Sequence, residues 1–184
     1  MRVIAGKYRH RILKWPDDVK HIRPTKDRIR ESVFNALGDI NGYCCLDLYS
    51  GSGAMGIEAL SRGASKAVFV DINPIALSVT KDNLKSLKVP SQEGLVLALE
   101  DVKAIEKLAN DGYIFDLIIL DPPYKEGKYI EIMSMLKDKG LISDKCIIVL
   151  ESDHNIDVDD AEFQRIKDYK YGETKIKILW RKYS

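Results

Sequence analysis

The sequence predicts a single α/β domain built on a mostly parallel β-sheet with helices on both faces. From about residue 43 to residue 150, apolar runs of strand length alternate with segments of helical periodicity, and alternating units of this length form parallel sheets. The chain has 184 residues, 45% of them hydrophobic and 31% charged, which suits one core of this size. No apolar run is long enough to span a membrane, and no signal peptide is evident, so we expect a cytoplasmic protein without membrane contact.

The elements can be assigned in chain order from their periodicity and capping residues. Thr25 is expected to cap a helix that ends before Gly38, and Asn73 to cap a helix that begins at Pro74. The predicted strands are 43–48, 67–71, 94–99, 115–120 and 145–150, and the other predicted helices are 54–61, 102–109 and 128–136. Residues 2–15 are expected to form a short hairpin at the N-terminus, and residues 163–169 and 174–181 an antiparallel hairpin at the C-terminus.

The charges are unevenly distributed along the chain. The net charge is +1, but residues 1–30 contain ten Lys or Arg against three Asp, or +7, which leaves −6 for the rest. A basic segment joined to a mildly acidic body suggests a polyanionic partner, and Tyr8 and Trp15 lie among these charges where bases could stack on them. Taken alone, the segment fits a solvated surface equally well.

Neither the cysteines nor the histidines have the spacing of a metal site. The cysteines fall in predicted strands, where free cysteine is usually a small buried side chain. The histidines are scattered and form no cluster. We therefore expect no bound metal. The residues concerned are Cys44, Cys45, Cys146, His10, His21 and His154.

A glycine-rich segment, residues 47–56, follows the first strand of the predicted sheet. Gly51, Gly53 and Gly56 match the GxGxxG pattern, and Asp71 lies 20 residues after Gly51, where an acid can bind a ribose. These features fit NAD as well as S-adenosylmethionine. Asp47 favours the second cofactor, because a carboxylate four residues before Gly51 repels a pyrophosphate but attracts an ammonium group.

Glu100, Asp101 and Val102 follow the third strand. A carboxylate at this place can accept a hydrogen bond from the amino group of adenine, while the next apolar side chain packs on the ring. Asp101 is equally suited to be the N-cap of the helix that follows, and the two roles are compatible.

The tetrapeptide Asp121-Pro122-Pro123-Tyr124 follows the fourth strand and carries the most specific signal. An exocyclic base amine is a poor nucleophile, because its lone pair is delocalised into the ring. The Asp121 carboxylate and the Pro122 carbonyl can accept its two N–H groups and direct the lone pair at a sulfonium methyl group. Tyr124 would stack on a base drawn out of its own stack. The alternative is a rigid turn after a strand.

Together these residues resemble a known family. Residues 47–56 and 121–124 look like those of class I methyltransferases that methylate amines. More narrowly, the whole chain is similar to the RsmD family, bacterial methyltransferases acting on the exocyclic amine (N2) of a guanine in 16S ribosomal RNA. The matching segments keep their order and span nearly the whole chain: 1–9, 22–31, 34–35, 46–63, 115–124, Glu151 and 171–175.

The resemblance implies a Rossmann-like, seven-stranded sheet with an antiparallel last strand, and S-adenosylmethionine as cofactor. It implies a partner that is ribosomal RNA, the small ribosomal subunit or its assembly intermediate. Residues 1–22 would be a basic extension that engages RNA, and residues 23–184 the methyltransferase domain. The sequence differs from the family at Tyr49 and Ser50, where Phe and Ala are common, and at Asp71, where Glu is common.

The resemblance also assigns roles to individual residues. The catalytic set would be Asp121, Pro122 and Tyr124. Cofactor contacts are expected at Asp47, Tyr49, Gly51, Gly53, Asp71, Ile72, Asp101, Val102 and Asp121, and RNA contacts at Lys7, Arg9, Arg11, Arg23, Thr25 and Arg28.

Three other functions fit parts of the sequence. A DNA adenine-N6 methyltransferase has a similar tetrapeptide, but this chain is short for an added target-recognition domain. An NAD-dependent dehydrogenase fits the glycines, but no residue is evident to handle a hydride acceptor. A non-enzymatic RNA-binding protein would not need Asp47, Asp71 and Asp121. Since no long apolar face is left over, we expect a monomer.

Overall fold

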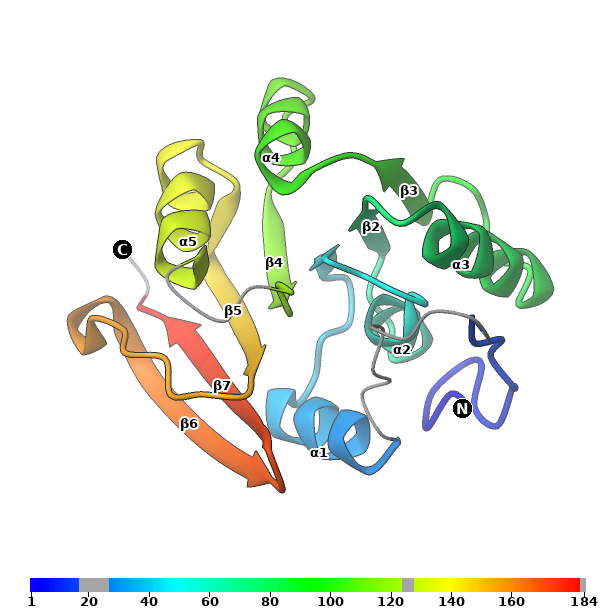
Figure 1. The fold of residues 1–184 in the computed structure, drawn as a ribbon, viewed down its shortest axis with the longest axis horizontal. Coiled ribbons are helices and arrows are strands. Elements are labelled where there is room, and N and C mark those ends of the chain that lie inside the picture. The colour runs from blue at the N-terminus through cyan, green and yellow to red at the C-terminus, as the bar shows by residue number, and fades with distance from the viewer. Residues whose placement is uncertain (17–26, 124–127, 183–184) are drawn as a thin grey trace.

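The computed structural model describes residues 1–16, 27–123 and 128–182. Its seven strands are β1 (Cys44–Leu48), β2 (Lys66–Asp71), β3 (Gly94–Ala98), β4 (Phe115–Leu120), β5 (Ile142–Ser152), β6 (Phe163–Tyr171) and β7 (Thr174–Arg181). They form one sheet in the order β3-β2-β1-β4-β5-β7-β6, with β1 to β5 parallel and β7 antiparallel to both of its neighbours (Figure 1). The seven-stranded sheet with an antiparallel last strand is confirmed.

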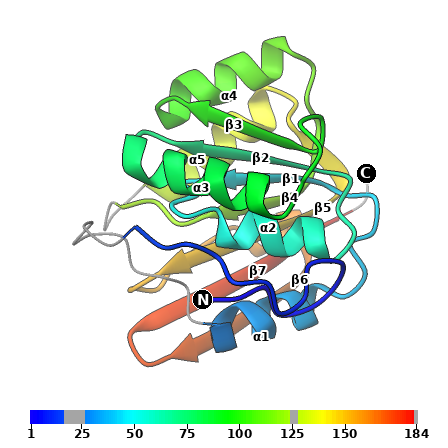
Figure 2. The same cartoon turned by 90° about the vertical axis from the view of Figure 1, so that its right-hand side faces the viewer.

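Helices cover both faces of the sheet. The helices are α1 (Asp27–Leu37), α2 (Ala54–Ser61), α3 (Pro74–Ser86), α4 (Asp101–Asn110) and α5 (Lys128–Asp138), with a short 3₁₀ turn at Asp160–Glu162. Successive strand residues point to opposite faces. Accordingly, Cys45 and Leu117 join the core under α1, α2 and α3, which lie toward the viewer in Figure 2, whereas Leu46 and Ile118 join the core under α4 and α5.

The structure confirms most element assignments and shifts some boundaries. Asn73 caps α3 as predicted, with its side chain accepting hydrogen bonds from the backbone N–H groups of Ile75 and Ala76. The prediction that Asp101 is the N-cap of α4 is wrong, because Glu100 holds that place with extended backbone angles, and Asp101 is already helical. The fifth strand begins at residue 142 rather than 145, as the pairing of Phe115 with Ile142 extends it. Thr25 lies outside the described residues.

The N-terminal segment, residues 1–16, is not a regular hairpin but a chain packed against α2. It has one antiparallel bridge, between Arg2 and Ile12. The backbone N–H groups of Ile4 and Ala5 donate to the carboxylate of Glu58, which is fully buried on α2. A buried carboxylate requires such partners, so this contact ties the segment to the helix.

Close backbone contact explains the path of the segment past the end of α2. The N–H of Lys7 donates to the carbonyl of Ser61 at 2.8 Å. Gly6 has φ of +82°, and a Cβ atom there would lie only 1.8 Å from that carbonyl oxygen, so no other residue fits. Three apolar side chains of the segment, Val3, Tyr8 and Leu13, are buried in the core under α1 and α2.

The structure can be compared with what the sequence predicts for the cysteines, for metal binding and for membrane contact. Cys45 and Cys146 are fully buried and Cys44 is half-buried, all three as free thiols. Burial raises the pKa of Cys44 to about 11, so this group is a thiol rather than a thiolate at neutral pH. Within residues 1–16, 27–123 and 128–182, no group of three or more His, Cys, Asp or Glu could hold a metal ion. None of the helices described is long and apolar enough to cross a membrane.

Candidate active site at the carboxyl edge of the sheet

The carboxyl ends of the parallel strands meet along one edge, where ligands bind in open α/β sheets. Among the acidic side chains at or just after these ends are Asp47, Asp71, Asp101, Asp121 and Glu151. The sequence predicted the four Asp as site residues. It matched Glu151 to the family without giving it a role.

Two of these acids hold the glycine-rich loop. Gly51 donates its N–H to Asp71 Oδ2 at 2.8 Å, and Gly56 donates to Asp47 Oδ2 at 2.9 Å. On the outer side of the loop, Thr80 Oγ1 of α3 donates to the Gly51 carbonyl at 3.0 Å. The loop is therefore fixed by side chains from β1, β2 and α3 before any ligand arrives.

The third glycine has a packing role. A Cβ atom at Gly56 would lie 2.4 Å from the ring of Phe69 on β2, so a side chain there would push α2 away from the sheet. Gly53 has φ of +80° as the residue before α2, a conformation that glycine adopts without strain. Both glycines let the helix begin close to the end of β1.

Asp71 and two exposed apolar side chains form one flank of the edge. Asp71 Oδ1 accepts the Asn73 N–H at 2.9 Å, so each carboxylate oxygen has one backbone partner and can still accept a ribose hydroxyl. Ile72 is 64% exposed and Val102 is 40% exposed, and both follow strand ends. Exposed apolar side chains at such a place suit the faces of a planar ring. Their cofactor contacts remain predictions.

Asp101 has partners that the sequence did not indicate. Its Oδ2 atom accepts hydrogen bonds from the Tyr49 hydroxyl at 2.8 Å and from Lys128 Nζ at 2.7 Å. Burial acts to raise the pKa of Asp101, but the hydrogen bonds from Lys128 and Tyr49 outweigh it, so this pKa lies below its usual value. Sequence analysis missed Lys128, for which the only signal was its place at the start of a predicted helix.

The carboxylates nearest the centre of the edge repel one another. Burial raises the pKa of Asp47 to about 7. The hydrogen bond from the Gly56 N–H lowers this pKa, whereas the negative charges of Asp71 and Glu151 raise it further. The pKa of Asp121 is also raised, by burial and then by the charges of Glu151 and Asp47. The Asp121 side chain is exposed to solvent, so the charges of Glu151 and Asp47 are the stronger cause of its raised pKa. A cation placed here would relieve that repulsion.

The other side of the edge consists of Asp121, Pro122 and the end of β5. Pro122 is buried, which fixes the backbone next to Asp121. The Tyr129 hydroxyl of α5 donates to the Glu151 carbonyl at 2.6 Å and so joins α5 to the end of β5. Tyr124, the predicted stacking residue, lies outside the described residues.

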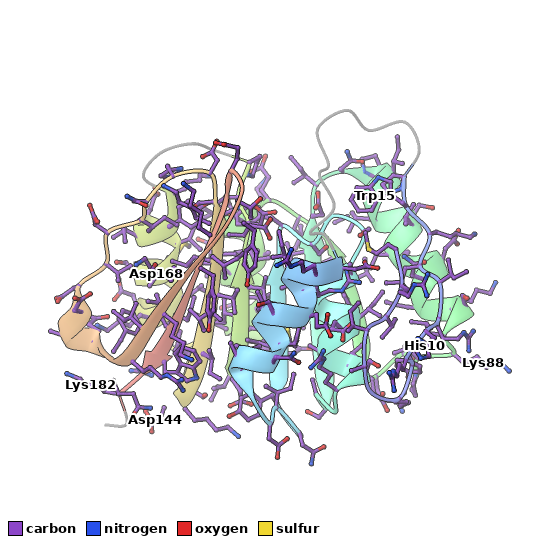
Figure 3. All side chains as sticks on the ribbon, turned by 90° about the horizontal axis from the view of Figure 1, so that it is seen from below. His10, Trp15, Lys88, Asp144, Asp168 and Lys182 are labelled. Atoms are coloured by element: carbon purple, nitrogen blue, oxygen red, sulfur yellow. The ribbon has the colours of Figure 1, made fainter. Side chains whose placement is uncertain are left out.

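Two of the predicted RNA-contacting residues that the structure describes, Lys7 and Arg11, lie away from the site. Helices α2 and α3 begin at the carboxyl edge and run to the opposite edge. Lys7 lies beside Ser61, the last residue of α2, and Arg11 donates to the carbonyl of Ser86, the last residue of α3, at 2.9 Å. In Figure 3, His10 of the same segment lies near Lys88, which follows α3, and Trp15 lies away from both.

Only the end of the N-terminal segment approaches the site. Asn83 of α3 accepts the Lys14 N–H at 2.8 Å and donates to the Ser52 carbonyl of the glycine-rich loop at 3.4 Å. The segment thus leads from the far edge of the sheet toward the site. Arg9 is exposed along it, and Arg28 is exposed on α1. Arg23 and Thr25 lie outside the described residues.

Comparisons with known proteins agree in assigning the chain to one family. The family model described as Conserved hypothetical protein 95 matches residues 1–180. The Bacillus subtilis protein YlbH is 35% identical over 97% of both chains. Ribosomal RNA small subunit methyltransferase D of Escherichia coli is 35% identical over 83% of this chain and 75% of its own. The solved structure of the Escherichia coli protein yhhF has a TM-score of 0.85 and 30% identity, and covers 100% of this chain and 99% of that one.

Proposed function

Because the chain belongs to the RsmD family, we propose that it transfers the methyl group of S-adenosylmethionine to the exocyclic N2 amine of a guanine in 16S ribosomal RNA. The observation that carries this proposal is the cluster of Asp47, Asp121 and Glu151, whose mutual repulsion a cationic ligand would relieve. S-adenosylmethionine carries a sulfonium and an ammonium group. The pyrophosphate of NAD would add negative charge to the same cluster.

The residues present fit this cofactor. Asp47 would bind the ammonium group, Asp71 the ribose hydroxyls and Asp101 the adenine amine, with Ile72 and Val102 against the ring. When bound, the cofactor supplies an electrophilic methyl group on a positively charged sulfur. The fixed glycine-rich loop lets these contacts form without reordering the backbone, which lowers the entropic cost of binding.

Asp121 and Pro122 make the amine reactive. The Asp121 carboxylate and the Pro122 carbonyl each accept one N–H of the guanine amine, and the nitrogen lone pair is directed at the methyl carbon. Transfer of the methyl group would leave the cofactor as a neutral thioether. The amine then loses a proton, and a carboxylate with a raised pKa such as Asp121 is suited to accept it before passing it to water.

The remaining assignments belong to the same proposal. The partner is ribosomal RNA in the small subunit or in its assembly intermediate, and the enzyme acts in the cytoplasm as a monomer. Residues 1–22 engage RNA and residues 23–184 form the methyltransferase domain. Arg9, Arg28 and the predicted RNA contacts at Arg23 and Thr25 would bind phosphates, while Tyr124 stacks on the flipped base.

The decisive experiment combines purified protein, tritiated S-adenosylmethionine and small ribosomal subunits from cells that lack the enzyme. Nucleoside analysis of the labelled RNA should find the label in N2-methylguanosine. Asp121→Ala should abolish labelling, whereas Asp111→Ala, at an exposed carboxylate beyond α4, should not. Label in adenine, or label in DNA but not in RNA, would refute the assigned acceptor.

A further inference from the structure

Three segments of the chain meet at the carboxylate of Asp101. Tyr49 follows β1, Asp101 begins α4 and Lys128 begins α5, and the hydroxyl of Tyr49 and the Nζ of Lys128 both reach Asp101 Oδ2. The side chains of Lys128 and Asp101 are 30% and 9% exposed. We call this set the Tyr49–Asp101–Lys128 bridge. Lys128 is also seven residues after Asp121. The bridge therefore links the start of α5 to Asp101, one of the predicted cofactor contacts.

The hydrogen bonds at Asp101 leave one acceptor position open. An ionised carboxylate has about four positions for hydrogen bonds. Oδ2 accepts from Tyr49 and Lys128, and Oδ1 accepts the Val102 N–H at 2.8 Å. The free position is therefore on Oδ1, and the bridge fixes the rotation of the carboxylate that determines where this position points.

The bridge differs from the other ion pair on the same helix. Lys107 Nζ of α4 lies 2.8 Å from Oδ2 of Asp111, the residue after the helix, but these side chains are 48% and 43% exposed. Exposed pairs of this kind contribute little, because water screens the charges and the side chains are costly to hold in place. The Asp101 carboxylate has little contact with water, so its charge and orientation depend on its partners.

We propose that Lys128 is a positioning residue, which acts through Asp101 and Tyr49 to present one carboxylate oxygen to the adenine amine of the cofactor. The inference rests on the proposed function and adds to it a specificity role for Lys128 and for the Tyr49 hydroxyl. The bridge also holds the start of α5 close to Asp101 at the start of α4.

The test compares two ligands that differ at the adenine amine and, as a consequence, at the neighbouring ring nitrogen N1, which carries a hydrogen in inosine but not in adenosine. S-inosylhomocysteine carries a carbonyl oxygen where S-adenosylhomocysteine carries the amine, and a second acceptor facing the carboxylate is unfavourable. By calorimetry on the full chain, we expect the wild type to prefer S-adenosylhomocysteine by at least ~10-fold, the factor that corresponds to one hydrogen bond of about 1.4 kcal/mol.

Lys128→Met should weaken binding of S-adenosylhomocysteine by roughly tenfold, the range for a charge-assisted hydrogen bond, while changing binding of S-inosylhomocysteine much less. The preference should therefore fall toward one. Lys128→Arg keeps the charge and should restore most of the preference, and Tyr49→Phe should lower it a few-fold. Lys107→Met, which breaks the exposed pair, should leave both affinities unchanged.

Each outcome decides between the two proposals. Equal weakening of both ligands by Lys128→Met would mean that the bridge only stabilises the fold, and the inference would fail. If Lys128→Met does not fold, as a thermal unfolding scan would show, Tyr49→Phe carries the test, because it removes only a hydroxyl. A wild type that binds S-adenosylhomocysteine without preference would also overturn the inference and leave the proposed function standing. A wild type that binds neither ligand would refute the proposed function instead.

Discussion

The two halves of the site edge use their carboxylates differently. After β1, β2 and β3, each aspartate accepts a backbone N–H: Asp47 from Gly56, Asp71 from Gly51 and Asp101 from Val102. After β4, Asp121 receives no hydrogen bond from any of the residues that the structure describes.

Under the proposed function, this difference separates a cofactor-binding half from a reacting half. Backbone donors hold the first three carboxylates in one geometry, so the cofactor side is organised before binding. Asp121 keeps its acceptor capacity for a ligand, at the cost of a raised pKa beside other negative charges. Carboxylates in one cluster can therefore have different roles. Those that accept backbone N–H groups fix the local structure, and one without such a donor can accept hydrogen bonds from a ligand.

The largest expected effect comes from the reacting half. Asp121→Asn keeps the shape but presents an amide that accepts a hydrogen bond through one oxygen only and cannot take a proton. We expect kcat to fall by ~10²–10³-fold, as when one stabilising group is removed from a reacting centre, with S-adenosylmethionine affinity changed by no more than a few-fold. Single-turnover tritium transfer and calorimetry measure the two quantities. If the Asp121→Asn protein kept its activity, Asp121 would not have the proposed catalytic role, and the two halves would not differ in function.

Asp47→Asn should affect the binding half in the opposite way. The amide oxygen can still accept the Gly56 N–H, so the loop should keep its shape, but the charge that attracts the ammonium group is lost. We expect affinity for S-adenosylmethionine to fall by ~10–100-fold, the range for a hydrogen bond to a charged group. Calorimetry at pH 8 checks this. Unchanged affinity would show that Asp47 serves the loop alone.

The same substitution should stabilise the protein without cofactor at high pH. The pKa of Asp47 is raised to about 7, so its favourable contribution is present below its unfolded value of 3.8 and is lost as the pH rises through about 7. At pH 8 the ionised group costs up to about 4 kcal/mol, at 1.36 kcal/mol per pKa unit. We expect Asp47→Asn to raise Tm by several degrees at pH 8 and by little at pH 4. A Tm gain that is the same at both pH values would point to packing instead.

The local sequence was sufficient to predict those features that depend only on neighbouring residues. The cap at Asn73, the strand ends and the acids that follow them depend on neighbouring residues and on the regular βα alternation. Lys128 could not be found in this way, because its contact with Asp101 joins residues 27 positions apart across the edge of the sheet. The N-cap of α4 is Glu100 rather than Asp101, a difference of one residue, which is within the usual uncertainty of helix ends.

The N-terminal segment shows the same limit on a larger scale. Its charge predicted a polyanion-binding surface but not its place, since that depends on buried Glu58 of α2 accepting two backbone N–H groups from the segment. Sequence analysis grouped Lys7, Arg9 and Arg11 with Arg23. The structure places Lys7 and Arg11 at the edge of the sheet opposite the site.

The smallest expected effect tests whether that distant surface takes part in binding. Replacing both Arg9 and Arg11 with Ala removes two exposed charges far from Asp121, so RNA affinity should fall a few-fold with kcat unchanged. The slope of log K against log salt should become less steep by ~1.4, at about 0.7 per phosphate contact on a single strand. Lys139→Ala, at an exposed position after α5, is the control and should leave the slope unchanged. If the double variant has the wild-type slope, RNA does not follow the N-terminal segment, and docking must depend on positions closer to the site, such as Arg28.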